Sequence, residues 1–262
     1  MSELCDTGAV ELRRMIGAKE ISPVELLDSC LGRIERVNPA VNAVTAMCVE
    51  RAKSEAKAAE RAVMSGARLG PLHGLPIGIK DLNETGGLRT TWGSPLYADH
   101  VPEKDERMVA AVRKAGAIVV GKTNVPEWGA GANTRNPVYG ATGNPFDPKR
   151  ICGGSSGGSA VALATSMLPI CTGSDTGGSL RIPAAFCGIV GFRPSPGLVA
   201  SERRPLEPRP SRRPRRSRRV LDHRADRSLG AARRDLRRSR LHAARQAHPR
   251  YVRGAQIGRA HV

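Results

Sequence analysis

The sequence predicts an α/β protein, with a β-sheet covered by α-helices, over roughly the first 200 of its 262 residues. Two observations carry this prediction. Amphipathic helical segments open the chain, and short apolar runs with β-branched residues then alternate with further helical segments. Strands that alternate with helices are typical of a sheet whose surface is covered by helices.

The expected helices are marked by start signals and by the spacing of their apolar residues. Ser22, Pro23 and Glu25 form a capping box with a proline at the first helical position. Behind them, apolar residues between positions 26 and 34 fall on one helix face. Residues 48–66 repeat this pattern, and we expect further helices over residues 108–115 and 157–167. The expected strands cover residues 76–79, 118–120 and 168–172.

Composition limits the class of protein. No stretch is long and apolar enough to cross a bilayer, and the first twenty residues lack a signal-peptide pattern. The six cysteines show neither CxxC pairs nor the His/Cys spacing of a metal site, so they fit buried thiols in a reducing compartment. We therefore expect a cytoplasmic protein that needs no cofactor and has no metal ligands.

The strong basicity of the chain belongs to its C-terminal end. Residues 201–262 hold 20 Arg, no Lys and five acidic residues, so +15 of the formal net charge of +18 lies there. This segment could be a basic arm for nucleic acid or a membrane surface, or a disordered tail without a specific role. We favour a third interpretation, out-of-frame sequence, because lysine and apolar periodicity are both lost and residues 257–262 look like a translated adapter. Nucleic acid and membrane are accordingly not expected partners.

These observations predict two parts of the chain. Residues 1–205 form the N-terminal part of a single domain, and residues 206–262 form an arginine-rich tail that is disordered or out of frame.

Two runs rich in glycine and serine are the strongest functional signals. Residues 153–159 read Gly-Gly-Ser-Ser-Gly-Gly-Ser, and residues 173–181 read Gly-Ser-Asp-Thr-Gly-Gly-Ser-Leu-Arg. Structured apolar flanks argue against a flexible linker. The first run lacks the Gly-Lys-Ser/Thr ending of a phosphate loop, and a G-x-S-x-G nucleophile elbow is absent. Backbone with unusual dihedral angles beside hydroxyl groups suits an active site.

A nucleophilic serine needs a base, and the first 200 residues offer three candidates. His73 lies in a turn and His100 in an expected surface loop, and neither has an oriented carboxylate nearby in the sequence. Lys80 ends an apolar strand, where burial favours the neutral amine that can accept a proton. The alternative for Lys80, a surface pair with Asp81 at the strand end, fits these residues equally well.

The segment around Lys80 and the two glycine-serine runs resemble, in that order, the amidase signature family. Residues 121–127 and 183–188 extend the resemblance, which covers about residues 5–200. It implies a mixed β-sheet covered by α-helices on both faces. It also implies a Ser–cis-Ser–Lys triad, with Ser179 as nucleophile, Ser155 as bridging serine after a cis peptide bond, and Lys80 as base.

The same resemblance implies how substrate is held. The backbone N–H groups of Thr176, Gly177, Gly178 and Ser179 would form the oxyanion hole, and the main chain near Gly129 would line the acyl pocket beside Ser155. Residues that would support the nucleophile loop without taking part in the chemistry are Ser156, Asp175 and Arg181.

The expected function is hydrolysis of the carbon–nitrogen bond of small linear amides through a serine acyl-enzyme. Residues 127–133 favour a general amidase over the main alternative, the A subunit of a glutamyl-tRNA amidotransferase. The expected partner is a small-molecule amide, and a homodimer is one candidate assembly. Family members continue well past residue 262, so we expect the sheet to be incomplete at its C-terminal side. Open strand edges would make the chain as written poorly soluble and weakly active, or a non-functional fragment.

Overall fold

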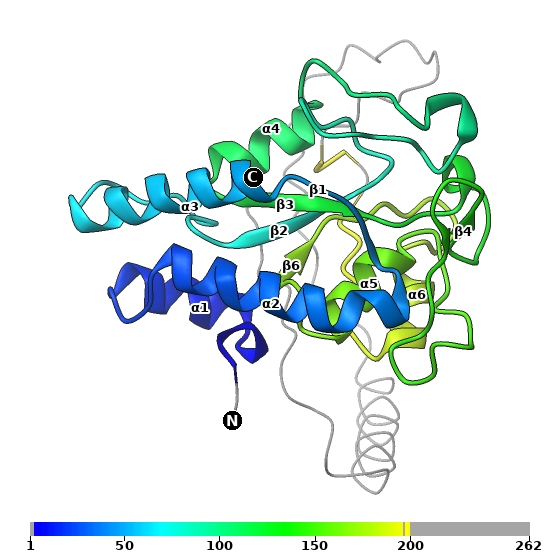
Figure 1. The fold of residues 1–262 in the computed structure, drawn as a ribbon, viewed down its shortest axis with the longest axis horizontal. Coiled ribbons are helices and arrows are strands. Elements are labelled where there is room, and N and C mark those ends of the chain that lie inside the picture. The colour runs from blue at the N-terminus through cyan, green and yellow to red at the C-terminus, as the bar shows by residue number, and fades with distance from the viewer. Residues whose placement is uncertain (1–2, 196, 200–262) are drawn as a thin grey trace, which may run out of the picture. The chain divides into compact units, whose positions relative to one another are not determined.

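The structure, a computed structural model, describes residues 3–195 and 197–199 (Figure 1). Its main sheet has four strands in the order β1-β3-β2-β6. Strand β1 runs antiparallel to β3, whereas β2 runs parallel to both β3 and β6. The sheet is therefore mixed, as predicted. The helices and strands are α1 (Ala9–Gly17), α2 (Pro23–Val41), β1 (Val44–Met47), α3 (Val49–Met64), β2 (Pro76–Lys80), α4 (Arg107–Lys114), β3 (Ile118–Thr123), β4 (Arg135–Asn136), β5 (Gly140–Ala141), α5 (Gly157–Ala164), β6 (Ile170–Cys171) and α6 (Arg181–Cys187), with short 3-10 turns η1 (Leu4–Asp6), η2 (Pro95–Tyr97) and η3 (Glu127–Gly129).

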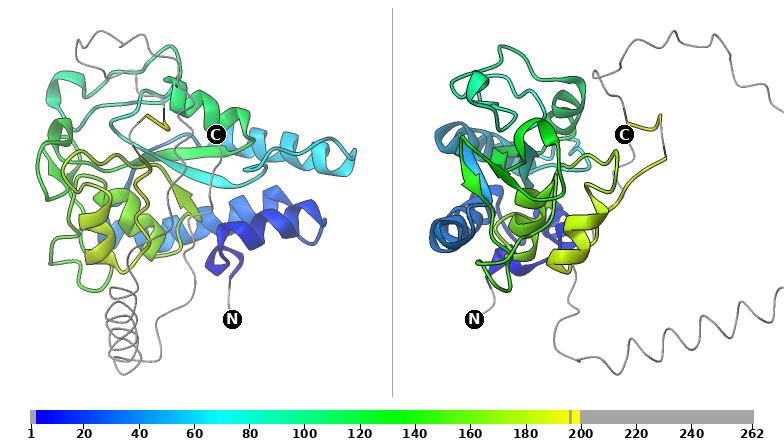
Figure 2. Two further views of the ribbon diagram at one scale, coloured as in Figure 1. Left: turned by 180° about the vertical axis from the view of Figure 1, so that it is seen from behind. Right: turned by 90° about the vertical axis from the view of Figure 1, so that its right-hand side faces the viewer.

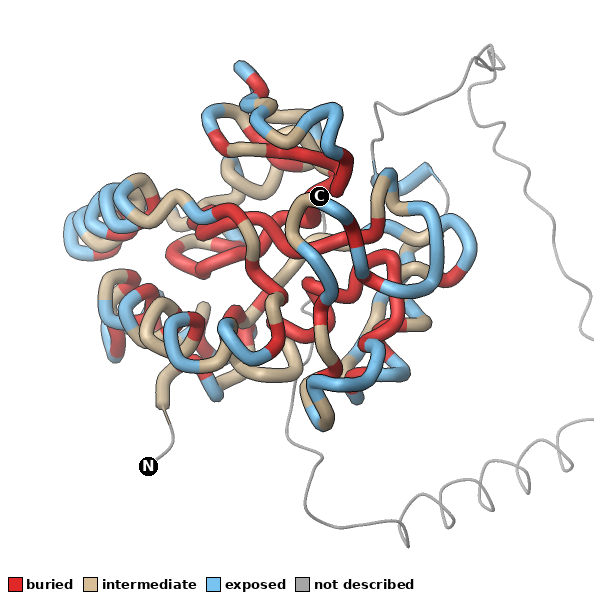
Figure 3. Tube along the Cα trace, turned by 45° about the vertical axis from the view of Figure 1, so that its right-hand side comes forward, coloured by how far each residue is buried: buried red, intermediate tan, exposed pale blue. Residues whose placement is uncertain are grey.

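Helices lie on both sides of this sheet. Figure 1 and the left view of Figure 2 place α4 on one side, and α1, α2 and α5 on the other. The buried segments follow the central strands β2 and β3, in red in Figure 3, where every residue is buried. This continuous burial explains why both strands are nearly unbroken apolar runs in the sequence.

The predicted start of α2 is confirmed. Ser22 caps the helix by accepting a hydrogen bond from the Glu25 N–H, and the Glu25 carboxylate accepts one from the Ser22 N–H. The predicted apolar face is buried at Leu26, Leu27, Cys30 and Ile34. Asn42 ends the helix in the left-handed conformation, with φ of 51°.

The structure corrects the sequence prediction at several elements: α1, β4 and β5 were not predicted, and β3 runs on to Thr123, past the expected end at residue 120. The helix expected over residues 157–167 ends at Ala164, and the strand expected over residues 168–172 shortens to β6. Strand β1 was not predicted because it is only four residues long and follows α2 without a clear turn signal. Helix α6 was not predicted because it contains Pro183, which is tolerated in the first turn, where its missing N–H is not needed.

Helix α5 packs so closely on the sheet that glycine is required at its start. A Cβ atom on Gly158 would collide with the backbone nitrogen of Asn124 and lie 2.7 Å from the carbonyl oxygen of Ala43. Gly158 N–H donates to the carbonyl of Asn124 at 3.2 Å. Residue 158 thus fixes the distance between α5 and the end of β3.

We predict that Gly158→Ala lowers the free energy of unfolding by about 1–3 kcal/mol or more, because the backbone must move to admit one methyl group. The matched control is Gly32→Ala in α2, where the added methyl would meet a flexible arginine side chain at 3.4 Å. That control should be neutral or stabilising by up to about 1 kcal/mol. Urea denaturation of both variants measures the difference, and equal effects would contradict this packing account.

Candidate active site

Strand β2 delivers Lys80 to the centre of the site. β2 lies between β3 and β6, and Lys80 is its last residue, in register with Thr123 of β3. The Lys80 N–H donates to Thr172 Oγ1 at 2.8 Å, which fixes the strand end against the chain that follows β6. Lys80 has no solvent exposure. The sequence alternative of a surface Lys80–Asp81 pair is therefore wrong.

The Lys80 amine is surrounded by serine hydroxyls. Its Nζ donates hydrogen bonds to the Oγ atoms of Ser155, Ser156 and Ser174 at 2.7, 2.8 and 2.9 Å. An ammonium group would donate all three bonds, whereas a neutral amine would donate two and accept the third. Removal from water disfavours the charged form of an amine. The hydroxyl shell therefore suits a lysine that exchanges a proton with one serine.

Ser155 and Ser174, but not Ser156, have hydroxyl protons that are available for this exchange. Ser156 Oγ donates to the carbonyl of Ser174 at 3.3 Å, so its proton is engaged. Within residues 3–195 and 197–199, Ser155 Oγ has no hydrogen-bond partner other than Lys80. Ser155 is 2% exposed, and the peptide bond that precedes it, Gly154–Ser155, is cis.

Hydroxyl contacts hold the start of α5 against the sheet. Ser159 Oγ lies 2.6 Å from Thr123 Oγ1 of β3 and donates to the carbonyl of Thr172 at 2.8 Å. The Gly157 N–H donates to Thr134 Oγ1 at 3.1 Å. The first turn of α5 is thus tied to both neighbours of the strand that carries Lys80, which places Ser155 and Ser156 next to Nζ.

Ser179 lies on the adjoining loop and is partly buried. Its carbonyl accepts a hydrogen bond from the Ser156 N–H at 3.2 Å, so the loop is joined to the Ser155–Ser156 segment. Among the described residues no hydrogen bond joins the hydroxyls of Ser155 and Ser179. The structure therefore brings Lys80 and Ser155 into contact and places Ser179 beside them.

Asp175 organises the Ser179 loop. Its carboxylate accepts hydrogen bonds from the N–H groups of Gly178, Leu180 and Arg181 at 2.7–3.4 Å. The Arg181 guanidinium adds two more, with Nε 2.9 Å from Oδ2. Hydrogen bonding to Arg181 is the main cause that holds the pKa of Asp175 far below its ordinary value, and the backbone donors act in the same direction.

The expected oxyanion donors differ in how they are used. The Gly178 N–H is engaged by Asp175 at 2.7 Å, with Gly178 at φ of 115°. In the described part of the chain the N–H groups of Thr176, Gly177 and Ser179 form no hydrogen bond. Thr176 and Gly177 are exposed. These three donors, rather than all four, are open to a ligand in this conformation.

Gly129 ends η3 with φ of 71°, and an added Cβ would lie 2.6 Å from Leu82. The chain then continues to Ala132 and Asn133, whose backbone packs against Gly154. A Cβ atom added to Gly154 would lie 3.1 Å from this backbone. The segment that begins at Gly129 therefore reaches the residue before Ser155.

The two histidines do not serve this site. His73 Nε2 lies 3.0 Å from the carbonyl of Ala59 in α3, and His100 stacks on Trp92 with ring centroids 5.2 Å apart. Among the described residues neither histidine contacts Ser155 or Ser179.

Sequence reasoning missed two features. Ser174 was read only as part of a motif, although its hydroxyl bonds Lys80. A second buried lysine, Lys122, forms an ion pair with Asp81 at 3.9 Å, and both side chains have no exposure. Removing one partner of such a buried pair costs about 3–5 kcal/mol. The sequence signal that could have revealed a buried Lys122 was its place in the Gly121-Lys122-Thr123 run, at the end of an apolar strand.

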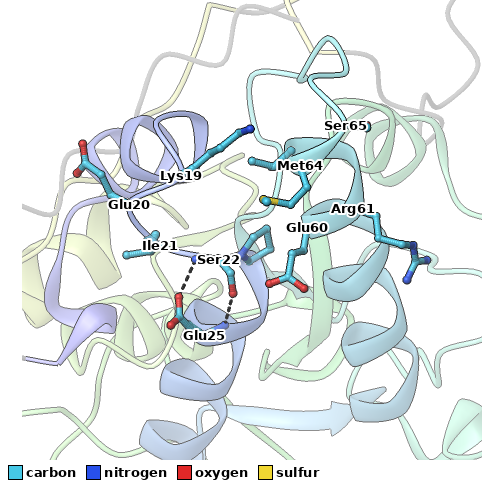
Figure 4. Close-up of a pocket in the computed structure, with 11 residues that line it drawn as sticks. Lys19, Glu20, Ile21, Ser22, Glu25, Glu60, Arg61, Met64 and Ser65 are labelled. Carbon is cyan, nitrogen blue, oxygen red and sulfur yellow. Dashed lines mark hydrogen bonds between the residues drawn. The ribbon is translucent and has the colours of Figure 1, made fainter.

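A surface pocket of about 710 Å³ opens elsewhere, between the start of α2 and the end of α3 (Figure 4). Ser22 and Glu25 face it but are engaged with each other in the capping box. None of the predicted site residues lines this pocket.

In the described residues no group of three or more His, Cys, Asp or Glu side chains could hold a metal ion, and none of the described helices is long and apolar enough to cross a membrane.

Comparison with known proteins assigns the family. A family model described as Amidase matches residues 25–213. The chain belongs to the amidase signature family. Among solved structures, this amidase-signature chain is similar to a bacterial aryl acylamidase of the same family, with a TM-score of 0.73 and 35% identity over 76% of this chain and 42% of that one. It is also similar to an amidase, with a TM-score of 0.70 and 40% identity over 74% of this chain and 44% of that one.

Curated relatives of this amidase-signature chain include the A subunit of glutamyl-tRNA(Gln) amidotransferase. The protein from Acidothermus cellulolyticus is 44% identical over 200 residues, which is 76% of this chain and 40% of the relative. The protein from Azoarcus sp. is 45% identical over 190 residues, 72% of this chain and 39% of the relative. The chain thus spans about 40% of the length of the curated relatives it matches. The predicted boundary at residue 205 and the tail 206–262 lie outside the described residues.

We predict that Asp175→Asn loosens the Ser179 loop, because a neutral amide binds the backbone donors and Arg181 more weakly. Hydrogen bonds to a charged group contribute about 1.5–3 kcal/mol, so exchange of the Gly178, Leu180 and Arg181 amides, which donate to Asp175, should accelerate tenfold or more. The lowered pKa of Asp175 keeps this stabilisation fully present above about pH 4 and loses it only at lower pH. The difference between wild type and variant should therefore be independent of pH from 5 to 8.

The control is Asp147→Asn, because Asp147 also accepts a backbone N–H and binds an arginine, Arg150, but on an exposed loop. It should leave exchange of the Gly178, Leu180 and Arg181 amides unchanged. Unaltered protection of these amides in the Asp175 variant would contradict the role given to its carboxylate.

Proposed function

We propose that this chain carries the catalytic centre of an amidase that hydrolyses carbon–nitrogen bonds of small linear amides through a serine acyl-enzyme. The observation that supports this most strongly is the 2.7 Å contact between the buried Lys80 Nζ and Ser155 Oγ. The proposal assigns catalysis to Lys80, Ser155 and Ser179, and substrate contacts to Gly129, Ser155, Thr176, Gly177 and Gly178. The protein would act in the cytoplasm, without a cofactor.

The acylation step begins at Ser179. Its Oγ attacks the amide carbonyl carbon, while its proton passes to Ser155 Oγ and the Ser155 proton passes to neutral Lys80. Backbone donors of the 176–179 segment would stabilise the negative carbonyl oxygen. Gly178 would have to exchange its bond to Asp175 to join them, so Thr176, Gly177 and Ser179 are the readier donors.

The relay then runs in reverse. Lys80, now an ammonium, returns a proton through Ser155 to the amine nitrogen as the carbon–nitrogen bond breaks, because an amide anion is a poor leaving group. Water attacks the acyl-Ser179 ester and gives up a proton along the same path. The carboxylic acid leaves, and the three side chains regain their starting protonation states.

The second candidate function is that of the A subunit of an amidotransferase, which the 40–45% identity of the curated relatives favours. In that case the same triad would release ammonia for a partner protein rather than into solution. Residues 127–133 led us to prefer the amidase. Genes for partner proteins next to this one, together with preferential hydrolysis of glutamine, would reverse that preference.

We predict that a fluorophosphonate probe labels the full chain at Ser179. The Ser179 Oγ–P bond would form as the P–F bond breaks, with the serine proton moving through Ser155 to Lys80. Peptide mass spectrometry locates the label, which does not require turnover of an amide. Lys80→Met should slow labelling by about 10²–10⁴-fold, the usual contribution of a general base.

Two variants control this experiment, each checked for folding by circular dichroism. Ser179→Ala should remove the label, and Ser65→Ala, at the exposed end of α3, should leave its rate unchanged. A label found on Ser155, or a folded wild-type chain without any label, would contradict the assignment of the nucleophile.

A further inference from the structure

Two buried lysines stand at the same end of neighbouring parallel strands and point to opposite faces of the sheet. Lys80 ends β2 in register with Thr123 of β3, and Thr123 contacts Ser159 on the α5 side, where Lys80 meets its serines. Side chains alternate between faces along a strand. Asp81 follows Lys80 and Lys122 precedes Thr123, so both lie on the other face of the sheet. There they form their ion pair at 3.9 Å.

Asp81 is built into the end of the strand that holds Lys80. Its N–H donates to the carbonyl of Thr123 at 3.0 Å, which extends the β2–β3 pairing by one residue. Its carboxylate accepts hydrogen bonds from the Thr91 hydroxyl at 2.6 Å and from the Thr91 N–H at 3.2 Å. A movement of Asp81 would therefore be passed directly to Lys80, the residue before it.

The Asp81 carboxylate has no exposure, so its negative charge needs a partner. Burial raises the pKa of Asp81, and the charge of Lys122 and the hydrogen bonds from Thr91 oppose that rise. Burial, followed by the charge of Asp81, raises the pKa of Tyr139, which places a third group at this cluster. Lys122 is the cation that faces the carboxylate from the adjacent strand.

Lys122 also holds the turn that follows β2. Its Nζ donates to the carbonyl of Asn83 and to Thr85 Oγ1, the latter at 3.0 Å. One amine thus connects β3 with the chain on the C-terminal side of Lys80, while Thr172 holds Lys80 itself from the side of β6.

We propose that Lys122 is a positioning residue for the amidase reaction, which holds Lys80 against Ser155 by neutralising and anchoring Asp81 on the opposite face of the sheet. This inference rests on the proposed function. It assigns the second lysine a role in the reaction without contact to substrate. The geometry of Lys80 is then set by an ion pair that the reacting groups never touch.

If Lys122 positions Lys80 through Asp81, single and double variants of this ion pair should differ in a way that a general loss of stability would not produce. Removing either charge alone leaves the other buried without its partner, whereas removing both leaves a neutral cluster. Each single variant should therefore disturb the end of β2 more than the double variant does. Small misplacements of a reacting group reduce rates by up to about 10²-fold.

The experiment compares the maximal rate of fluorophosphonate labelling of Ser179, kinact, and its half-saturating probe concentration, KI, in the full chain. We expect Lys122→Met and Asp81→Asn each to lower kinact about tenfold or more with KI little changed. The double variant should recover to within about threefold of wild type. Arg33→Met, which removes partly buried ion pairs to Glu3 and Asp6 near the N-terminus, should leave kinact unchanged.

Circular dichroism and urea denaturation show that each variant is folded, and Lys122→Gln replaces Lys122→Met if the latter is not. Wild-type kinact in the folded single variants, or a double variant as slow as the product of the two single effects, would overturn the inference alone. A wild-type chain that is not labelled at Ser179 would instead overturn the proposed function, and the inference with it.

Discussion

The contact between a buried amine and a ring of hydroxyls is the constraint on which the rest of this structure depends. Lys80 has no exposure, and its Nζ lies 2.7–2.9 Å from three serine hydroxyls. A lysine can be placed there only if the strand that carries it is held from both sides. β3 and β6 flank β2, and Ser159 Oγ fastens α5 across them through the Thr123 hydroxyl and the Thr172 carbonyl. The sheet is thus the frame that brings a base on β2 to serines at the start of α5.

The Ser179 loop is held by a different principle. Where Lys80 is held by neutral hydroxyls, residues 176–181 are gathered around the charged carboxylate of Asp175 and the guanidinium of Arg181. The carboxylate determines which backbone donors remain open for an oxyanion, since it engages Gly178 and leaves Thr176 and Gly177 exposed. Charge lies at the edge of the site, whereas the groups around the Lys80 amine are neutral hydroxyls.

Much of this arrangement was predictable, and the misses have physical reasons. The capping box of α2 and the apolar runs of β2 and β3 are local signals, so their positions followed from the sequence. β1 and α6 depend on tertiary contacts or carry a proline, so local patterns did not reveal them. At the site, ordered motifs pointed to Lys80 and Ser155, which the structure joins. The partnership of Asp81 with Lys122 was out of reach because it pairs residues 41 positions apart across two strands, and periodicity carries no information on such a pair.

The central claim is that Lys80 and Ser155 act as one proton relay on Ser179, and a double-mutant cycle tests it most directly. The rate of Ser179 labelling would be measured in wild type, Lys80→Met, Ser155→Ala and the combined variant. Residues that act as a unit give strongly non-additive effects. The account predicts that the combined variant is no more than about threefold slower than the slower single variant. Two effects that multiply in full would show that the residues act independently, and would contradict the account.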